Sequence, residues 1–583
     1  MNDNSVGSTI TGSTGTPSAG SAYFLEYGSL GTNSIVLRNL RFSYASEAIE
    51  GSITSIGVNS IEVWDCQFFD CVDAFGTAVN YSFTGSDPGF PINLYNVLFS
   101  QLYSGFAGLN SSGHLAINAV NVTADQMQAL ELAGLTMSGT SNTCHATNCL
   151  FTTVTNLTAV SLTSCYTNAS SAGIYQVVGA GGYYLAAGSP YRDAGTASIP
   201  SSLLVDLQTL TTYPPVIVPS GWFTNNYTFF PQAQRDTDTL DLGYHYDPID
   251  FAIDIAVSNA TVTVLPGTVL AGYGNQYGVY LFTNGVINCQ GTATSPNYFV
   301  QYNTVQEQSN TNWETVAWVG LILTPDEADS SSANFVFTDW SVLAGGVQIS
   351  GQSVACPFAL QNCQLYTGYI NGTGTVLSVT NCLFQRGNLL VSDRTDGNIA
   401  QSFYNNLFWN GVLFIKHLNS GQYTLRDNLF NQTSNSLSGV INYCSNNAYV
   451  TTNFGVFAPT NGDIILTASP AYQMGALGQY YYPTNLSLIH AGSQSAPAAG
   501  LYHYTVTTNN TIEGTNIVSI GFHYVAVGSN GLPLDTNGDG IPDYLEDANG
   551  NGLVDSGEID WLVAGDLGLT VIITQPANNT TIP

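Results

Sequence analysis

Asn381-Cys-Leu-Phe384 is one copy of a short phrase that recurs in both halves of the chain. Each copy begins with Asn or Asp and has an apolar residue, usually Phe, in its fourth position. The copies are Asn39–Phe42, Asp65–Phe68, Asn96–Phe99, Asn121–Ala124, Asn148–Phe151, Asp339–Val342, Asn362–Leu365, Asn381–Phe384, Asn405–Phe408 and Asp427–Phe430. Successive fourth positions lie 26, 31, 25 and 27 residues apart in the first half, and 23, 19, 24 and 22 apart in the second. Such a period predicts a short β unit stacked on itself, because one unit cannot bury its own apolar face.

The phrase predicts a turn flanked by two strands. Asn and Asp tolerate the left-handed backbone conformation and hydrogen-bond to their own backbone, which suits them to the turn. Strand side chains alternate between faces, so the second and fourth positions share one face. We therefore expect each coil to contain a strand, the Asn turn, a strand, a bend and a third strand, and the fold to be all-β.

In these Asn-containing turns, residues 30–525 resemble the right-handed parallel β-helix proteins of the pectate-lyase-like superfamily. The resemblance implies a right-handed parallel β-helix, a solenoid in which each coil lies on the one before it. It implies no single function, because this fold hosts lyases, hydrolases, adhesins and inert stalks.

Two landmarks late in each half indicate that the chain is an internal duplication. Pro190 and Gly243 correspond to Pro470 and Gly521, with offsets of 280 (470 − 190) and 278 (521 − 243) residues. We therefore expect two tandem β-helix units, each closed by the same kind of tail. The predicted domains are residues 1–248, residues 249–530, a calcium-binding segment at 531–560, and residues 561–583, which resemble the start of a bacterial immunoglobulin-like module.

The charge of the chain excludes one class of partner. It has 39 acidic and 8 basic residues and a net charge of −31, so it lacks the basic patch that binds nucleic acid. Anionic membrane surfaces are disfavoured for the same reason. The sequence contains no run of 18 apolar residues that would predict a transmembrane helix.

A surface of Asn, Thr, Ser and Tyr is typical of secreted β-rich proteins. We expect a secreted or cell-surface protein, although residues 1–21 lack a signal-peptide pattern, and we interpret the sequence as a piece of a longer one.

Four of the ten cysteines, Cys66, Cys149, Cys363 and Cys382, occupy the second position of the phrase. The favoured interpretation is that they are small buried residues of a ladder inside the coil. The alternative is a disulfide between Cys363 and Cys382 on successive coils, which lie about 4.8 Å apart, within the range of disulfide-bonded Cα atoms. No Cys or His spacing fits zinc, so a zinc site is excluded.

Residues 535–558 contain two twelve-residue loops with the pattern of calcium-binding loops. Ca²⁺ takes about six to eight oxygens, from loop positions 1, 3, 5, 7, 9 and 12, with Gly at position 6. The first loop offers Asp535, Asn537, Asp539, the carbonyl of Ile541, Asp543 and Glu546, and the second offers Asp547, Asn549, Asn551, the carbonyl of Leu553, Asp555 and Glu558. No helix fits between the loops, so they resemble thrombospondin type 3 and related calcium repeats rather than a paired EF-hand. That resemblance implies a linker stiffened by calcium.

Candidate catalytic residues are few. Asp393, Arg394 and Asp396 form the best local group of acids and base, and Asp70 and Asp73 on a first-unit coil come second. The motifs of the polygalacturonase family, such as Asn-Thr-Asp and Gly-His-Gly, do not occur in the sequence. We therefore interpret both groups as solvated turn acids, one of them with an Arg ion pair.

Aromatic residues complete the set of candidates. His245, His503 and His523 each lie in an aromatic-His-Tyr triplet at or near a tail, and we expect them to pack in the caps. The 34 tyrosines suit strands, and exposed ones can stack on sugar rings.

We expect a calcium-stiffened surface scaffold that contacts polysaccharides or cell-surface glycans, or acts in adhesion. The alternative is a polysaccharide lyase or glycoside hydrolase acting on a coil face, and the oligomeric state stays open.

Overall fold

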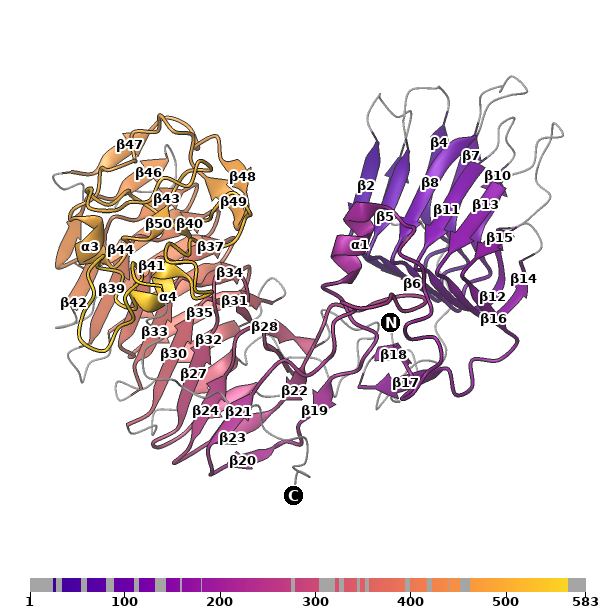
Figure 1. Cartoon of the computed structure of the whole chain (residues 1–583), viewed down its shortest axis with the longest axis horizontal. Coiled ribbons are helices and arrows are strands. Elements are labelled where there is room, and N and C mark those ends of the chain that lie inside the picture. The colour runs from indigo at the N-terminus through magenta and orange to yellow at the C-terminus, as the bar shows by residue number, and fades with distance from the viewer. Residues whose placement is uncertain are drawn as a thin grey trace.

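The structure is a computed structural model in which the strands form two separate stacks of parallel sheets, each with a tail packed on its side (Figure 1). Within the described residues, no sheet joins strands of one stack to strands of the other. The fold is mostly β, and the prediction of a parallel β-solenoid is confirmed for the three sheets of the second stack. The first stack consists of parallel sheets, so a second β-helix unit there and the handedness of the coils stay predictions. The described residues are 25–27, 34–53, 60–79, 89–109, 115–131, 143–157, 160–179, 181–273, 278–302, 320–324, 330–342, 347–351, 356–393, 399–416, 422–439, 441–450 and 462–564.

The second stack is a solenoid of three parallel sheets, and each coil contributes one strand to each sheet. Sheet A contains β19 (Val216–Ile217), β22 (Phe251–Ile253), β25 (Val269–Gly272), β28 (Asn297–Gln301), β31 (Thr338–Ser341), β34 (Gln364–Tyr366), β37 (Leu383–Gln385), β40 (Leu407–Trp409), β43 (Leu429–Asn431), β46 (Ala448–Val450) and β47 (Ile464–Leu466). Sheet B contains β20 (Gly221–Phe223), β23 (Ile255–Val257), β26 (Val279–Leu281), β29 (Gly320–Thr324), β32 (Val347–Gly351), β35 (Tyr369–Thr373), β38 (Asn388–Ser392), β41 (Val412–Lys416) and β44 (Ser434–Ser438). Sheet C contains β21 (Tyr227–Phe229), β24 (Thr261–Val264), β27 (Val286–Gln290), β30 (Ser332–Val336), β33 (Phe358–Gln361), β36 (Leu377–Thr380), β39 (Ala400–Tyr404), β42 (Gln422–Arg426) and β45 (Tyr443–Ser445).

The first stack has two parallel sheets. One contains β2 (Ile35–Arg38), β5 (Ile61–Trp64), β8 (Phe90–Tyr95), β11 (Leu115–Val120), β13 (Thr143–Thr147) and β15 (Val160–Thr163). The other contains β1 (Leu25–Tyr27), β3 (Arg41–Ser43), β4 (Glu47–Ile53), β6 (Gln67–Phe69), β7 (Asp73–Val79), β9 (Leu98–Ser100), β10 (Ser104–Leu109), β12 (Thr123–Glu131), β14 (Leu150–Asn156) and β16 (Tyr166–Asn168). Strand β12 pairs with β9 near its start and with β10 near its end, so it joins two faces of the coil in one sheet.

The first residue of the phrase turns the chain as predicted. Its φ lies between 51° and 58° at Asn39, Asp65, Asn96, Asn121, Asn148, Asn362, Asn381, Asn405 and Asp427. Two residues after the phrase, a second left-handed residue makes the predicted bend, as at Arg386 and Asn410, both with φ of 56°. We call the first of these turns the Asn corner. The Asn corners of successive coils lie one above another, because their flanking strands pair in register.

At one copy the predicted register is wrong by two residues. The pattern predicts the corner at Asp339, but Phe337 takes it, with φ of 42°, and Asp339 lies in β31 opposite Gln364. Trp340 then points inward and is fully buried. Composition favoured Asp339, because a bulky residue at positive φ is uncommon. A shift of two residues keeps Trp340 on the inward face, so side-chain alternation does not distinguish the two registers, and the pairing of β31 with β28 and β34 decides between them.

Inside the coils, rings and polar groups form two ladders. Phe384 and Phe408, from fourth positions of the phrase, stack with centroids 4.7 Å apart. At the second positions, the N–H of Cys382 donates to Asn406 Oδ1 (2.8 Å), and the N–H of Asn406 donates to Asn428 Oδ1 (3.1 Å). A buried N–H without a partner costs stability, so each side chain satisfies the backbone of the coil before it.

The cysteine ladder is confirmed, and the alternative disulfide is wrong. All ten cysteines are free thiols, nine of them buried. The N–H of Cys363 donates to Cys382 Sγ at 3.4 Å. The thiol therefore accepts from the preceding coil, as the Asn side chains do on later coils.

The chain enters the second stack before the first tail is complete. Strands β19, β20 and β21 pair with β22, β23 and β24, so residues 216–229 form the lowest coil of the second stack, although the sequence assigned them to the unit 1–248. The chain then returns to the first stack, where Tyr246 pairs with Thr211, before β22 begins. In this position Phe229 is fully buried against the coil above.

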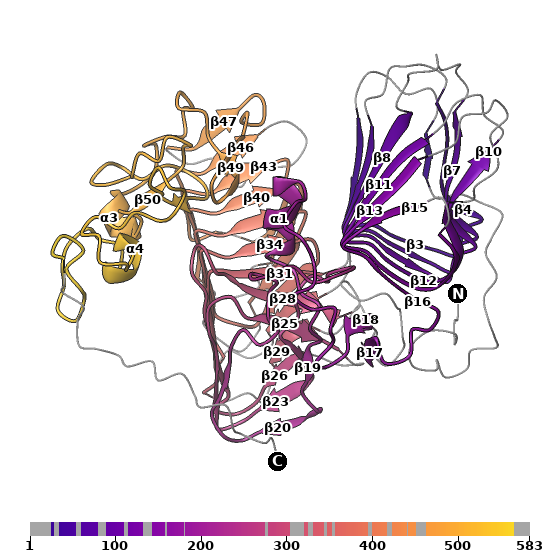
Figure 2. The ribbon, with the colours of Figure 1, turned by 45° about the vertical axis from the view of Figure 1, so that its right-hand side comes forward.

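Each tail lies along the side of its stack instead of covering its end (Figure 2). The first tail contains β17 (Tyr175–Val178), β18 (Gly181–Leu185) and α1 (Ser201–Leu207). The second tail and the residues after it contain β48 (Gln473–Gly475), β49 (Gly478–Tyr481), α3 (Ala496–Ala499), β50 (Tyr504–Thr505), β51 (Tyr524–Val525) and α4 (Asp543–Glu546). Asn96 accepts from the N–H of His245 (2.7 Å) and donates to its carbonyl (2.9 Å). Asn381 and His523 make the same two bonds at the same distances. The two tails therefore dock on Asn corners in the same way.

Candidate metal sites

The first predicted calcium loop is a tight turn around Asp535. The N–H groups of Gly538 and Gly540 donate to its two carboxylate oxygens at 2.7 and 2.9 Å, and Gly540, at position 6, has φ of 96°. Asp539 Oδ2 and Glu546 Oε2, from loop positions 5 and 12, are buried without a hydrogen-bond partner. Two orphaned carboxylate oxygens in one loop fit a bound cation, because a buried charge is costly unless it is paired.

The remaining residues of this loop shape it. The N–H and the hydroxyl of Thr536 both donate to Asp543 at 2.6 Å, and the N–H of Ile541 donates to Asp539. Asn537 donates to Glu546 Oε1 at 3.2 Å. Burial raises the pKa of Glu546, and although the Asn537 bond lowers it, the nearby carboxylates raise it further. The loop thus gathers negative charge that a cation would neutralise.

The second loop repeats the turn around Asp547. The N–H groups of Asn551 and Gly552 donate to its carboxylate at 3.1 and 2.6 Å. Asn549 and Asn551 both donate side-chain N–H groups to Asp555, at 2.8 and 2.7 Å. Two further bonds, from the N–H of Leu553 to Asn551 Oδ1 (2.7 Å) and from the N–H of Asn549 to Glu558 Oε1 (3.1 Å), close the loop.

In neither loop do three carboxylates approach within 4.8 Å of one another; among the described residues, the one group of His, Cys, Asp and Glu that does so lies elsewhere. The remaining expected ligands of the two loops are Asn oxygens and main-chain carbonyls, which calcium also takes.

The loops dock on the second stack. The hydroxyl of Tyr544, in α4, accepts from the N–H of Ala293 at 3.0 Å, and its ring packs edge-on against Phe337, 5.6 Å away. His503 Nε2 lies 3.0 Å from Asp547 Oδ2. His503, which the sequence assigned to cap packing, instead joins the second tail to the second loop, and the sequence carried no signal for this contact beyond its triplet. The loops are thus held against the solenoid and do not form a free linker.

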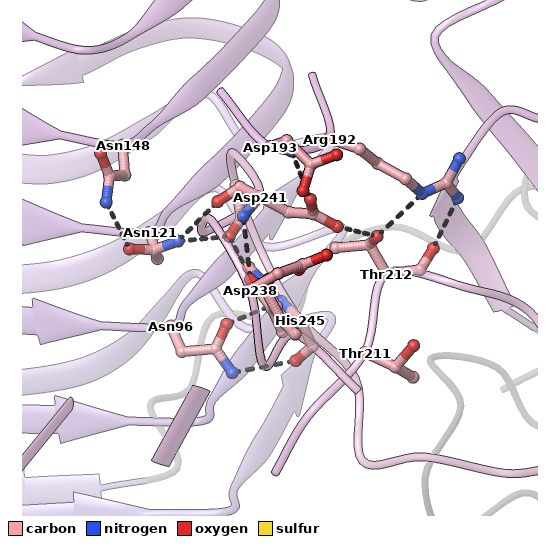
Figure 3. A network of polar contacts seen from close by, with 12 residues as sticks. Asn96, Asn121, Asn148, Arg192, Asp193, Thr211, Thr212, Asp238, Asp241 and His245 are labelled. Carbon is pink, nitrogen blue, oxygen red and sulfur yellow. Dashed lines mark hydrogen bonds and ion pairs between the residues drawn. The ribbon is translucent and has the colours of Figure 1, made fainter. Parts of the chain in front are cut away.

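A buried cluster in the first tail was not predicted. Asp236 Oδ2 lies 2.7 Å from His245 Nε2 and accepts from the N–H of Asp241 at 2.8 Å. One atom from each of these three residues lies within 4.8 Å of the others, a spacing that can hold a metal ion. Figure 3 shows Asp241 and His245 beside the row of Asn96 and Asn121, which donate to the carbonyls of His245 and Asp241.

Hydrogen bonds explain most of this cluster without a metal. Both oxygens of Asp241 accept, from the N–H of Asp193 (2.8 Å) and the hydroxyl of Thr212 (2.5 Å), while burial raises the Asp241 pKa. Both ring nitrogens of His245 face acceptors, because Nδ1 lies 3.0 Å from the carbonyl of Gly243. A metal ion at this cluster would have to bind Nε2 of His245, which is the ring nitrogen that already faces Asp236 Oδ2. We therefore interpret the cluster as the polar core of the first tail.

The candidate catalytic acids, which the sequence favoured as solvated turn residues, have different surroundings. Asp393 is fully buried, so that interpretation is wrong for Asp393, and Arg394 and Asp396 lie outside the described residues. Asp70 occupies a corner with φ of 49°, and Asp73 accepts from the hydroxyl of Ser104. Asp70 therefore serves a turn of the backbone, and Asp73 serves a hydrogen bond between neighbouring coils.

No protein-family model matches the chain, no curated protein is significantly similar in sequence, and no solved structure is significantly similar in fold. The class of protein is thus defined by the fold alone, a parallel β-solenoid with side-docked tails. None of its described helices has the length and apolar character needed to cross a membrane.

Proposed function

We propose that this protein is a secreted or cell-surface scaffold whose second solenoid is stiffened by calcium bound in residues 535–558. The observation that carries the proposal is the pair of orphaned buried oxygens on Asp539 and Glu546 in a loop whose Tyr544 packs on the solenoid. Calcium would neutralise the acidic loop and hold α4 against the turns that join sheet C to sheet A at Ala293 and Phe337. It would supply charge neutralisation and no chemistry.

The alternative of a polysaccharide lyase or glycoside hydrolase has less support. Glycosidases place two carboxyl groups on either side of the bond to be cleaved. Of the acids that the sequence suggested, Asp393 is buried, Asp70 lies at a corner, and Asp73 begins β7 and accepts from Ser104. A screen of neutral and acidic polysaccharides for new reducing ends and unsaturated uronides tests this alternative, and a positive result with purified protein would replace the scaffold proposal.

Calcium is expected to raise the Tm of the intact chain. Extracellular calcium modules bind with Kd of about 10⁻⁴ to 10⁻³ M, and a ligand at 100 times its Kd stabilises by about 2.7 kcal/mol. Differential scanning calorimetry with 0 and about 10 mM calcium measures the shift for wild type, Asp539→Asn and Glu546→Gln.

Both loop variants should lose most of the calcium-dependent shift, because each removes one charge facing the ion. The matched control is Asp238→Asn, an exposed acid of the first tail, which should keep it. An equal shift in all four proteins, or none in the wild type, would refute the calcium scaffold.

A further inference from the structure

A groove of about 580 Å³ lies between sheet A and the second tail. One wall is the outer face of sheet A, with Tyr298 on β28, Asp339 on β31 and Tyr366 on β34. The other wall is the β48–β49 hairpin, with Met474 and Tyr480. Its volume lies within the range of ligand sites, which measure about 300–1,000 Å³.

The groove exists because the tail covers only part of sheet A. Tyr298, Asp339 and Gln364 pair in register across β28, β31 and β34 and so project from one face in a row. The next residues of this row, Leu383 and Leu407, are fully buried under the tail. The row therefore changes from apolar to polar residues at the edge of the second tail.

The side chains in the groove form a polar site with aromatic walls. Tyr298 is 39 % exposed, whereas Asp339 is only 7 % exposed. The Tyr366 hydroxyl donates to Gln364 Oε1 at 3.0 Å, and the N–H of Gln364 bonds to the Asp339 carboxyl group. Burial raises the pKa of Asp339 to about 7, so the group is present both as an acid and as a carboxylate near neutral pH.

These groups suit hydroxyl-rich ligands. A hydroxyl both donates and accepts, so it matches either protonation state of Asp339. Tyrosine rings stack on the apolar faces of sugars and keep a hydrogen-bonding tip. No Lys, Arg or His of the described part of the chain lines the groove, and the net charge of −31 repels polyanions.

We propose that this groove binds a neutral oligosaccharide, with Tyr298 as the stacking platform and Asp339 and Gln364 as the hydrogen-bonding groups. Among the described residues, Asp339 is the one carboxylic acid that lines the groove, and because glycoside hydrolysis takes two, we infer binding rather than hydrolysis. The inference goes beyond the calcium-stiffened scaffold by naming a class of ligand and the surface that binds it.

The test is binding of the intact chain to an array of neutral glycans, followed by isothermal titration calorimetry with the best neutral oligosaccharide. Oligogalacturonate and chitosan oligomers serve as anionic and cationic probes. We expect a neutral oligosaccharide to bind, and Tyr298→Ala to weaken it by about tenfold or more. Tyr103→Ala is the matched control, because Tyr103 is an exposed tyrosine of the first stack (55 % exposed), and it should leave the Kd unchanged.

Asp339→Asn keeps the size of the side chain and should also weaken binding, and an unchanged Tm at pH 4 shows that it folds. Absence of binding to every neutral glycan, equal binding by Tyr298→Ala, or preference for the chitosan oligomer would overturn the assignment. The calcium-dependent Tm shift, recorded on the same samples, reports on the scaffold separately.

Discussion

At the scale of single residues, surroundings decide what an aspartate does. Asp535 lies in a turn and accepts from two main-chain N–H groups, whereas Asp339 lies on a strand under the edge of the second tail. Burial raises the pKa of Asp339 to about 7, and the N–H of Gln364 offsets only part of that rise. Burial, and to a smaller extent the negative charge of Asp339, raises the pKa of Tyr298 to about 12.

Asp339 should make stability fall as pH rises. Its folded-state pKa lies above the ordinary 3.8, so the folded protein binds the proton more tightly than the unfolded chain does. The contribution is fully present below about pH 4 and is lost as pH rises through about 7. Asp339→Asn should therefore gain about 2–4 kcal/mol relative to wild type between pH 4 and pH 8, measured by urea denaturation at both values. The same gain in Asp238→Asn, or no gain in Asp339→Asn, would contradict the prediction.

At the scale of elements, the Asn corner does two things. Its left-handed backbone turns the chain between strands, and on coils beside a tail its side chain also binds that tail, as Asn381 binds His523. Asn284 has the same backbone conformation, with φ of 54°, but it is exposed and bonds only to Asn259 of the neighbouring coil among its described side-chain bonds. The same residue type thus serves as a turn in one place and as a dock in another.

Asn381→Ala should cost about 2–4 kcal/mol of folding free energy, because it strains a left-handed corner and leaves the His523 N–H buried without a partner. Asn284→Ala is the control for the corner alone and should cost about 1–2 kcal/mol. Denaturant unfolding of both variants measures the difference. Equal losses would show that docking of the tail adds no stability.

At the scale of the whole molecule, the two stacks are interlocked by the path of the chain. Residues 216–229 belong to the second stack, while the residues on both sides of them pair beside the first, as Thr211 pairs with Tyr246. The Tyr302 hydroxyl adds a contact by donating to the carbonyl of Val178 in the first tail, at 2.9 Å. Arg235 and Asp250 form the ion pair at the crossing, at 2.6 and 3.0 Å.

Asp250→Ala should destabilise the protein by about 3–5 kcal/mol, because it leaves the Arg235 charge without its buried partner. Asp250 is fully buried and also accepts from the N–H groups of Gln232, Ala233 and Val269. Asp254→Ala, a half-buried acid of the next turn, should cost less than about 1 kcal/mol. Calorimetry of both variants is the measurement, and a loss no greater than that of the control would show that the crossing does not hold the stacks.

The sequence alone determined the period of the coils, the left-handed Asn corner, the inward second and fourth positions and the two loops of residues 535–558. These features repeat at short spacings, so local conformation and alternation of side chains encode them. The tertiary structure alone decided the register at Phe337 and Trp340, the crossing at residues 216–229 and the groove around Asp339. Each of these depends on which surface the chain buries between residues far apart in sequence, such as Asn381 and His523, separated by 142 residues, and no local pattern specifies such a partner.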